Sequence, residues 1–469
     1  MSRTRFSVAS AKGQENLKIM ATAVTKMKQL PSTNPLSWEY QAALHGTNNP
    51  ALKNAKFVNS CPHYAQAGDD TSKFFLVWHR LALYYFEEAI RAVSGRQDFT
   101  LPYWDTIDIN QRKIPKAFLS VENGGYASLY DPDRGKSLSD PSKPILNLND
   151  GKTILPTSDR YDTATQKLIG AKNSGYYIFN STIDSSPHGG PHIDIDGKML
   201  DFKTAALEPL FWVHHCNIDR LWATYSNDAV NPLEFSRLKP GMSFGFFNQK
   251  GQPVTYSYKK AAEAMYKLDY DYDTGANTLK PANANQKPKV KQTIFNKVLD
   301  QDIISLEGSK LIARPNTRLA RWTSSNARTI LSLTMESCHT TAGHIDILIG
   351  GLKKNTFDAI INYKFEDLKN MNNGKFLDQY YAGVINFIPH SGGSPEATTK
   401  PHAHGAASAS RKSCGDKNTY LFDITDELRA SGSKPTDPLN ISFNIDPDYN
   451  NFESLKTVIL ASAAIYNQI

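Results

Sequence analysis

The sequence predicts an α+β protein with more than one domain: a mainly α-helical bundle over residues 1–275, a linker over residues 276–300, and an all-β, sandwich-like domain over residues 301–469. Three observations support this division. The chain of 469 residues exceeds the ~250–300 residues that one hydrophobic core usually organises. Apolar residues at helical spacing dominate the first part, and short β-rich runs dominate the last. Between them, the stretch 273–291 has no aromatic side chain, which is typical of a connector.

Three segments of the first part carry apolar residues at helical spacing and are predicted to be helices: 15–30, 74–93 and 210–225. Pro31 ends the first of them, and Gly95 ends the second. Pro209 suits the first turn of the third, where a proline needs no amide hydrogen bond. The density of Asp, Ser, Pro and Gly between residues 106 and 175 predicts long loops there.

The last part contains seven short runs that are rich in β-branched and aromatic residues and are bounded by turn residues. In chain order they are ILSLTME (330–336), HIDILIGG (344–351), FDAIINYKF (357–365), YYAGVINFI (380–388), TYLFDIT (419–425), LNISFNI (439–445) and TVILASAAIY (457–466). Strands at such regular intervals indicate an all-β sandwich or barrel.

Composition and charge limit which binding partners and which cellular compartment are expected. The net charge of +7 comes from basic residues that are scattered along the chain, so nucleic acid is not expected as a partner. The N-terminal segment 1–30 lacks the apolar core of a secretory signal, and no later apolar run is long enough to span a membrane. We therefore expect a cytoplasmic protein or the processed form of a secreted one, without a membrane partner. The four cysteines are too dispersed for a disulfide framework.

Seven of the twelve histidines lie in the helical part, mostly beside apolar or aromatic residues: His45, His63, His79, His188, His192, His214 and His215. A buried imidazole without a partner costs about 1–3 kcal/mol, so several of them together indicate a metal site, although any one alone would fit a structural role. His188 and His192, four residues apart, can share a helix face. Imidazole suits copper, zinc, iron and nickel, and the absence of a Glu-x-x-His motif disfavours di-iron. Copper and zinc both remain open at this point.

Three segments resemble the two copper-binding regions of the tyrosinase, catechol oxidase and polyphenol oxidase family of type 3 copper proteins: FFLVWHRLALYYFEEAI (74–90), PHGGPHIDIDGKM (187–199) and EPLFWVHHCNIDRLW (208–222). The segments LPYWD (101–105) and LDYDYDT (268–274) resemble further family landmarks, so the resemblance covers residues 38–275. The β-rich part is similar in kind to the lid domain of plant and some bacterial polyphenol oxidases, without an equally specific motif.

The resemblance implies a dinuclear copper centre with three histidines on each ion: His45, His63 and His79 on the first, and His188, His192 and His215 on the second. In the histidine doublet the family ligand resembles the second member, so His214 is expected to pack beside the site. The Cys61-Pro62-His63 step resembles the motif in which many members join the cysteine sulfur to the ligand imidazole by a thioether. The alternative for Cys61 is a buried free thiol.

Several positions depart from the family pattern. His63 and His79 are sixteen residues apart, longer than usual, which predicts an extra loop beside the first copper. Gly189 follows His188 where monophenol-hydroxylating members often carry an asparagine, and Asp184 stands where a glutamate commonly helps to hold a water. Phe202 occupies the place of a bulky gate in plant catechol oxidases. The last three positions disfavour monophenol hydroxylation.

Four further residues are expected near the site. Phe211, one turn before His215, is predicted to pack a ligand ring or the substrate, and Ile193 is a candidate pocket wall. Arg80 and Asp219 could pair across the bundle or be separate surface charges. The histidines of the β-rich part are interpreted as structural or solvated: His339, His344, His390, His402 and His404.

The family resemblance implies an oxidase that converts o-diphenols to o-quinones while O₂ is reduced to water, with a small phenol and O₂ as its partners. Two alternatives share this chemistry, a full tyrosinase and an o-aminophenol oxidase. A third comes from another class, a hemocyanin-like protein that binds O₂ without turnover. The oligomeric state does not follow from the sequence.

Overall fold

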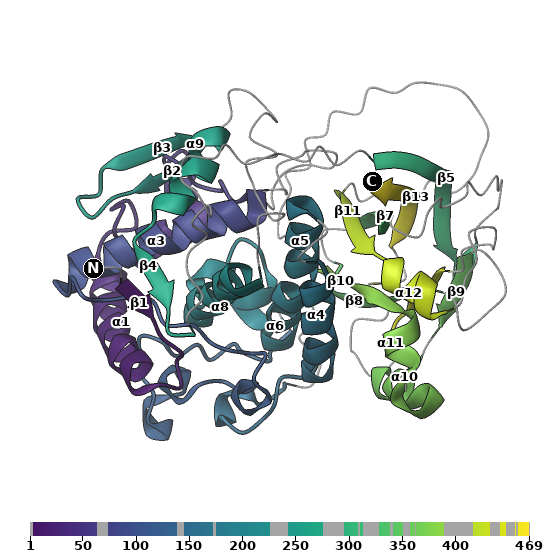
Figure 1. Cartoon of the computed structure of the whole chain (residues 1–469). Helices are drawn as coiled ribbons and strands as arrows, with labels where there is room; N and C mark the ends of the chain where they lie inside the picture. The colour runs from purple at the N-terminus through teal and green to yellow at the C-terminus, as the bar shows by residue number, and fades with distance from the viewer. Residues whose placement is uncertain are drawn as a thin grey trace, which may run out of the picture.

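A computed structural model describes residues 3–62, 74–137, 145–171, 175–225, 243–274, 295–307, 310–312, 328–337, 341–349, 357–361, 363–388, 416–431, 441–446, 455 and 458–468. A helical part and a β-rich part lie side by side (Figure 1). None of the described helices is both long and apolar enough to cross a membrane. Of the four cysteines, Cys61 and Cys216 are buried, and the other two lie outside the described residues.

The helical part contains α1 (Ala11–Gln29), α2 (Trp38–His45), α3 (Phe75–Ser94), α4 (Ser158–Ala171), α5 (Tyr176–Ile183), α6 (Gly189–Ile195), α7 (Gly197–Leu200), α8 (Pro209–Tyr225) and α9 (Tyr258–Ala264). A π-helical turn, η8 (Asp184–His188), joins α5 to α6. Short strands complete this part: β1 (Arg3–Arg5) pairs with β4 (Tyr270–Tyr272), and β2 (Ser243–Phe247) pairs with β3 (Pro253–Ser257).

The three predicted helices form at the expected places. The hydroxyl of Ser10 caps α1 by accepting from the amide of Gly13, and α1 ends before Pro31. Helix α3 ends at Gly95, whose φ of 77° favours glycine. Helix α8 begins at Pro209. Helix α3 packs against both α1 and α8, so the long apolar segments form much of the core of the bundle.

One prediction for this part was wrong: α4 lies within the segment 106–175 that was expected to be looped. Its buried residues follow helical spacing: Arg160, Tyr161, Ala164, Thr165, Leu168 and Ala171. Many polar residues share this helix, and their density hid the helical period. The loop prediction holds for much of the rest of the segment, where the described residues form turns and single 3₁₀ turns.

A buried cluster of charges joins β1, α3 and α8. Arg5 Nε donates to Glu87 Oε1 at 2.8 Å, and Arg5 Nη1 donates to Asp219 Oδ2 at 3.0 Å. Arg80 of α3 donates to the other carboxylate oxygen of Asp219. Every one of these side chains is at most 2% exposed. The expected pairing of Arg80 with Asp219 across the bundle is therefore confirmed, and the alternative of separate surface charges is wrong.

Two tyrosines of β4 complete the surroundings of Asp219. The hydroxyls of Tyr270 and Tyr272 each donate to Asp219 Oδ2 at 2.6 Å. Burial alone would raise the pKa of the Asp219 carboxyl, but Arg80, Arg5 and these hydroxyls outweigh burial and hold that pKa below its ordinary value. Strand β4 thereby ties the end of the helical part to α8.

The β-rich part contains β5 (Phe295–Glu307), β6 (Lys310–Ile312), β7 (Arg328–Ser337), β8 (Gly343–Ile349), β9 (Phe357–Ile361), β10 (Tyr381–Phe387), β11 (Asp416–Asp423), β12 (Ile441–Asn444) and β13 (Ile459–Gln468). They form two sheets, ordered β10-β8-β12-β9 and β11-β7-β13-β5-β6. Side chains from both sheets share one core, including Leu333, Ile347, Ile385, Phe443 and Ala463. Each of the seven predicted β runs overlaps one of these strands.

Two features of the β-rich part differ from expectation. It is not all-β, because three short helices lie among its described residues: α10 (Phe365–Asn370), α11 (Phe376–Tyr380) and α12 (Thr425–Ala430). Charged residues are interspersed in these segments, and only a few apolar side chains in each are buried, so the sequence carries little helical period. Strand β5 begins at Phe295, inside the segment 276–300 predicted to be a linker. Residues 275–294 lie outside the described ones, and the domain division stays a prediction.

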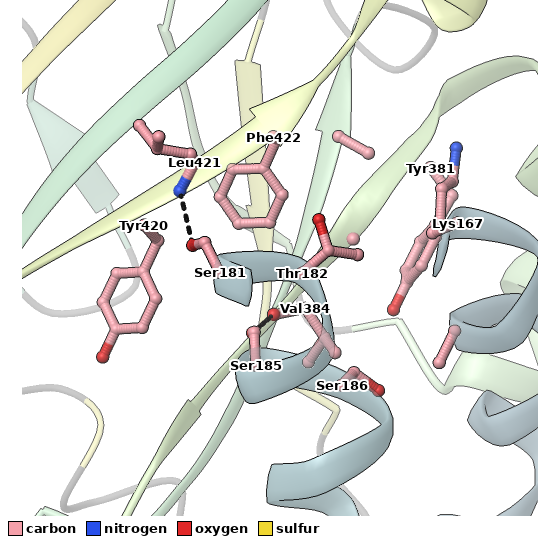
Figure 2. A pocket seen from close by; sticks show the side chains of 13 residues that line it. Lys167, Ser181, Thr182, Ser185, Ser186, Tyr381, Val384, Tyr420, Leu421 and Phe422 are labelled. Atoms are coloured by element: carbon pink, nitrogen blue, oxygen red, sulfur yellow. Dashed lines mark hydrogen bonds between the residues drawn. The ribbon is translucent and has the colours of Figure 1, made fainter. Parts of the chain in front are cut away.

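The two parts meet through apolar contacts, with Ile330 and Leu421 joining a core cluster of the helical part, and through polar contacts. Arg160 of α4 donates from Nη2 to Asp346 of β8 at 3.1 Å and to Asp446, which follows β12, at 3.2 Å, and all three are buried. Lys167 of α4 pairs with Glu427 of α12. A cleft lies between α4, α5 and η8 on one side and β10 and β11 on the other (Figure 2). In this cleft Leu421 donates its amide to the hydroxyl of Ser181.

We expect Asp219→Asn to lower the free energy of unfolding by about 3 kcal/mol at neutral pH, because two buried arginines lose their carboxylate. The folded state holds the pKa of Asp219 below that of the unfolded chain, so this stabilisation is complete above about pH 4. It is lost as the pH falls through the lower folded value. Urea unfolding of both chains from neutral pH to about pH 3 measures the difference.

Asp269→Asn is the matched control, since Asp269 is exposed and only one residue from β4. It should leave the free energy of unfolding nearly unchanged. A constant difference between Asp219→Asn and the parent chain at every pH would contradict the assigned pKa direction.

Candidate metal centre

Five of the predicted ligand histidines converge from five elements: His45 of α2, His79 of α3, His188 of η8, His192 of α6 and His215 of α8. All five are buried. His79 and His215 stack with ring centroids 4.2 Å apart and planes 7° apart, which places the two predicted sets against each other. Within the second set, the Nε2 atoms of His192 and His215 are 3.4 Å apart. His63 lies outside the described residues, so its place is a prediction from sequence.

Backbone carbonyls fix the orientation of four imidazoles through Nδ1. The pairs are His45 with Phe202 at 3.0 Å, His79 with Phe75 at 2.9 Å, His188 with Asp184 at 2.9 Å and His192 with Met199 at 2.7 Å. A carbonyl can only accept a hydrogen bond, so each Nδ1 carries the proton and each Nε2 carries the lone pair. This is the arrangement in which protein histidines bind metal ions. Among the described residues, Nδ1 of His215 has no such partner.

Burial keeps the imidazoles of the second set uncharged. It lowers the pKa of His188 to about 4 and lowers the pKa values of His192 and His215 well below the ordinary histidine value, with neighbouring imidazoles adding to the effect on the last two. Neutral imidazole is the form that binds a metal, so no proton has to be removed at neutral pH. A set of close, buried lone pairs without a positive charge fits a cation between them.

The donor atoms divide into two groups whose members lie within 4.8 Å of one another: His188, His192, His214 and His215 in one, and His45, Cys61 and His79 in the other. Neither group contains a carboxylate. Nitrogen and sulfur donors of this kind suit copper or zinc better than magnesium or calcium. Cys61 Sγ lies 3.8 Å from Nε2 of His79, so the cysteine lies beside the ligands predicted for the first copper ion. The thioether predicted with His63 involves a residue outside the described ones.

His214 lies behind the second set. Its Nε2 is 3.1 Å from the backbone carbonyl of His188, and the two rings stack with centroids 5.6 Å apart. Because Nε2 donates to a carbonyl, it is not free to bind a metal, and Nδ1 carries the lone pair of this ring. This contact fits the predicted role of His214 in packing, and His215 stays the predicted second-set ligand of the doublet.

A small cavity opens beside the imidazoles and is lined by His45, His188, His192, Phe202, Ala205 and Ile388. Phe202 stacks on His45 with ring centroids 4.5 Å apart, as a gate over the first set would. Phe211 lies between the sets, with its centroid 4.9 Å from that of His45 and 4.2 Å from that of His215. Ile388, which directly follows β10, is the contribution of the β-rich part to the cavity.

The remaining predicted residues take different places. The Asp184 carboxylate is 3.1 Å from Nδ1 of His188, so it supports that ring directly. Gly189 begins α6 and is buried against β10. Ile193 is half-buried and lies outside the set of described residues that line the cavity. As the neighbour of His192 on α6, it faces away from the open space.

Sequence reasoning missed Phe75 and Ile388. The ring of Phe75 lies 4.6 Å from that of His79 and 4.7 Å from that of His188, measured between centroids, so it packs both sets. The spacing of Phe75 and His79, one helical turn, could have indicated it. For Ile388 no local signal exists, because it is the last apolar residue of an ordinary β run and reaches the cavity only through the packing of the two parts.

Comparison with known proteins agrees with this geometry. Residues 35–228 match the family model of the common central domain of tyrosinase. The chain is 32% identical over 312 residues to a tyrosinase of Hahella sp. (strain CCB-MM4), a match that covers 58% of this chain and 63% of that protein. It is 24% identical over 298 residues to the chloroplastic polyphenol oxidase of Spinacia oleracea, covering 55% of this chain and 45% of that protein.

Solved structures share the fold over the whole chain. Latent apple tyrosinase superposes with a TM-score of 0.57 at 17% identity, covering 100% of this chain and 95% of that one. A latent aurone synthase, also a polyphenol oxidase, gives a TM-score of 0.59 at 16% identity, covering 100% and 89%. The match spans less than two thirds of the length of the two curated relatives above.

The two donor groups, the neutral imidazoles and the matched central domain agree on one cofactor, a pair of copper ions. The tyrosinase and polyphenol oxidase relatives resolve the choice between copper and zinc that the residues alone left open. Residues 35–228 match the common central domain of tyrosinase, and the chain is similar to the tyrosinases and polyphenol oxidases of the type 3 dicopper family.

Proposed function

We propose that this chain oxidises o-diphenols to o-quinones at a dicopper centre, and that the β-rich part restricts access to that centre. The observation that carries the proposal is the convergence of five buried imidazoles, three of which line a cavity together with Phe202. His45 and His79 would hold one copper ion together with His63, and His188, His192 and His215 would hold the other. When bound, the copper pair supplies the redox chemistry that moves electrons from the diphenol to O₂.

The protein contributes orientation and a dry surrounding. Hydrogen bonds from Nδ1 hold the rings of His45, His79, His188 and His192, so their Nε2 atoms need no reorganisation when metal binds. Phe202 and Phe211 exclude water and offer aromatic faces to a planar phenol. Oxidation of two diphenols releases four electrons and four protons, which convert one O₂ to two waters.

Diphenol oxidation is favoured over hydroxylation of monophenols by the shape of the site. Phe202 covers the ring of His45 and leaves little room above the first set. Position 189 has no side chain that could bind or orient a phenol next to His188. A full tyrosinase and an o-aminophenol oxidase would use the same metal centre and are separated from this proposal by substrate tests.

The first test concerns the histidine doublet. We expect His215→Ala to reduce the copper content from two ions per chain to about one, because the second set loses a ligand whose Nε2 lies 3.4 Å from that of His192. His214→Ala should retain two ions, since Nε2 of His214 donates to the carbonyl of His188. Elemental analysis after copper loading and dialysis, with circular dichroism to check folding, measures both. Loss of copper in His214→Ala but not in His215→Ala would reverse the assignment.

The second test concerns turnover. The copper-loaded chain should consume O₂ with 4-methylcatechol, and limited proteolysis should increase the rate, because Ile388 then leaves the cavity. Oxygen uptake and quinone absorbance, before and after proteolysis, distinguish an open enzyme, a covered enzyme and an O₂ carrier. No oxidation of 4-methylcatechol in either form would refute the proposal, and O₂ binding without turnover would favour the carrier.

The third test concerns substrate scope. With a trace of catechol as primer, tyramine should give at most a small fraction of the rate seen with 4-methylcatechol, because Phe202 restricts the space over His45. Phe202→Ala should increase the tyramine rate more than the 4-methylcatechol rate. Steady hydroxylation of tyramine by the unmodified chain would identify it as a full tyrosinase.

A further inference from the structure

A glycine is required at position 189 because a neighbouring side chain leaves no room for a Cβ, and not because of the backbone conformation there. Its φ of −66° and ψ of −29° lie in the right-handed helical region, which any residue adopts. A Cβ at this position, however, would lie 2.6 Å from the Cβ of Asn386 and 2.8 Å from its Nδ2. Both distances are far inside the ~3.5–4.0 Å at which non-bonded carbon atoms pack. Asn386 of β10 therefore fills the volume that a side chain at position 189 would occupy.

Hydrogen bonds surround this close approach. Asn386 donates from Nδ2 to the backbone carbonyl of Ser185 in η8. In the opposite direction, the hydroxyl of Ser185 donates to the backbone carbonyl of Val384 in β10, as Figure 2 shows. We call the four residues Ser185, Gly189, Val384 and Asn386 the docking contact. It combines two hydrogen bonds with one position at which the helical part has no side chain.

The docking contact adjoins the metal centre on both sides. Ser185 lies three residues before His188, in the turn whose Asp184 carbonyl orients that imidazole. Asn386 lies two residues before Ile388, which lines the cavity with His45 and His188. The position of β10 on η8 and α6 thus determines where the Ile388 side chain lies.

We propose that Asn386 and Gly189 form one matched contact that holds Ile388 in the metal cavity, so that Asn386 is a positioning residue that limits which phenols enter. The part about phenols rests on the proposed function, whereas the contact itself does not. Any side chain at position 189 would force β10 away from α6. The glycine is then explained by packing between the two parts of the chain.

A mutant cycle tests the match. Gly189→Ala is combined with Asn386→Ala, which keeps the Cβ at 2.6 Å, and with Asn386→Gly, which removes it. Gly170→Ala is the matched control, because a Cβ there meets no atom within 4 Å. The first readout is hydrogen exchange of residues 184–189 and 384–388 in the metal-free chain.

We expect Gly189→Ala to accelerate exchange in both segments by about tenfold or more in the parent chain and in the Asn386→Ala background. In the Asn386→Gly background, where the Ser185–Val384 hydrogen bond is the part of the docking contact that remains, the same change should have little further effect. Gly170→Ala should exchange like the parent. An equal effect of Gly189→Ala in all three backgrounds, or none in any, would overturn the proposal.

The second readout is the kinetics of the copper-loaded chain with 4-tert-butylcatechol. If the chain interconverts between a covered form and an open form, and only the open form binds the phenol, a larger open fraction lowers the apparent KM by the same factor. The value of kcat does not change with this fraction. Gly189→Ala should therefore lower KM about fivefold, and in the Asn386→Gly background the same change should leave KM nearly unchanged. A fall in kcat with unchanged KM would indicate damage to the metal centre and would refute the positioning role.

Two outcomes of the folding controls are also decisive. If Gly189→Ala does not fold alone but folds together with Asn386→Gly, the rescue supports the contact directly. If neither folds, the clash with Asn386 is not the cause and the proposal fails. Should the exchange pattern appear in a chain that oxidises no diphenol, the contact stands and the proposed function is refuted.

Discussion

The site depends on the hydrogen bonds that backbone carbonyls accept from Nδ1 of the buried histidines. Each carbonyl selects one tautomer and one ring orientation, and the apolar surroundings keep the imidazoles of the second set uncharged. These carbonyls come from distant segments: that of Phe202 holds His45, for example, although 157 residues separate them. The segment 184–207, which consists of short helices and turns, presents three of the four carbonyls. It is therefore as important for the orientation of the rings as the long helices that carry them.

The helices that carry His79 and His215 are kept in place by charges away from the site. Asp219 lies one turn after His215, and Arg80 directly follows His79, so their ion pair sets the relative position of α3 and α8. Arg5 and the tyrosines of β4 surround the same carboxylate. Such a cluster adds little net stability, because burying charges is costly, but only one arrangement of the chain satisfies it. It makes the stacking of His79 on His215 a consequence of the fold as a whole.

Much of this arrangement follows from sequence, and the remainder has physical reasons for escaping it. Helices α1, α3 and α8 were predictable because their apolar period is long and their ends carry Pro31, Gly95 and Pro209. Helix α4 escaped because polar residues obscure its period. Phe202 and His214 could be placed by family resemblance, but Ile388 could not, since only long-range packing brings it to the cavity. Gly189 was interpreted through the family pattern for monophenol hydroxylation. That pattern could not reveal that Asn386 packs against it.

The contact between Arg160 and the carboxylates of Asp346 and Asp446 affects which surface is exposed when the two parts of the chain separate. Where two parts of a chain meet through apolar faces, their separation exposes surface that promotes aggregation. At this point, separation would instead expose an arginine and two carboxylates, which water solvates well. Here the charges that are costly to bury favour the solubility of both parts when they come apart.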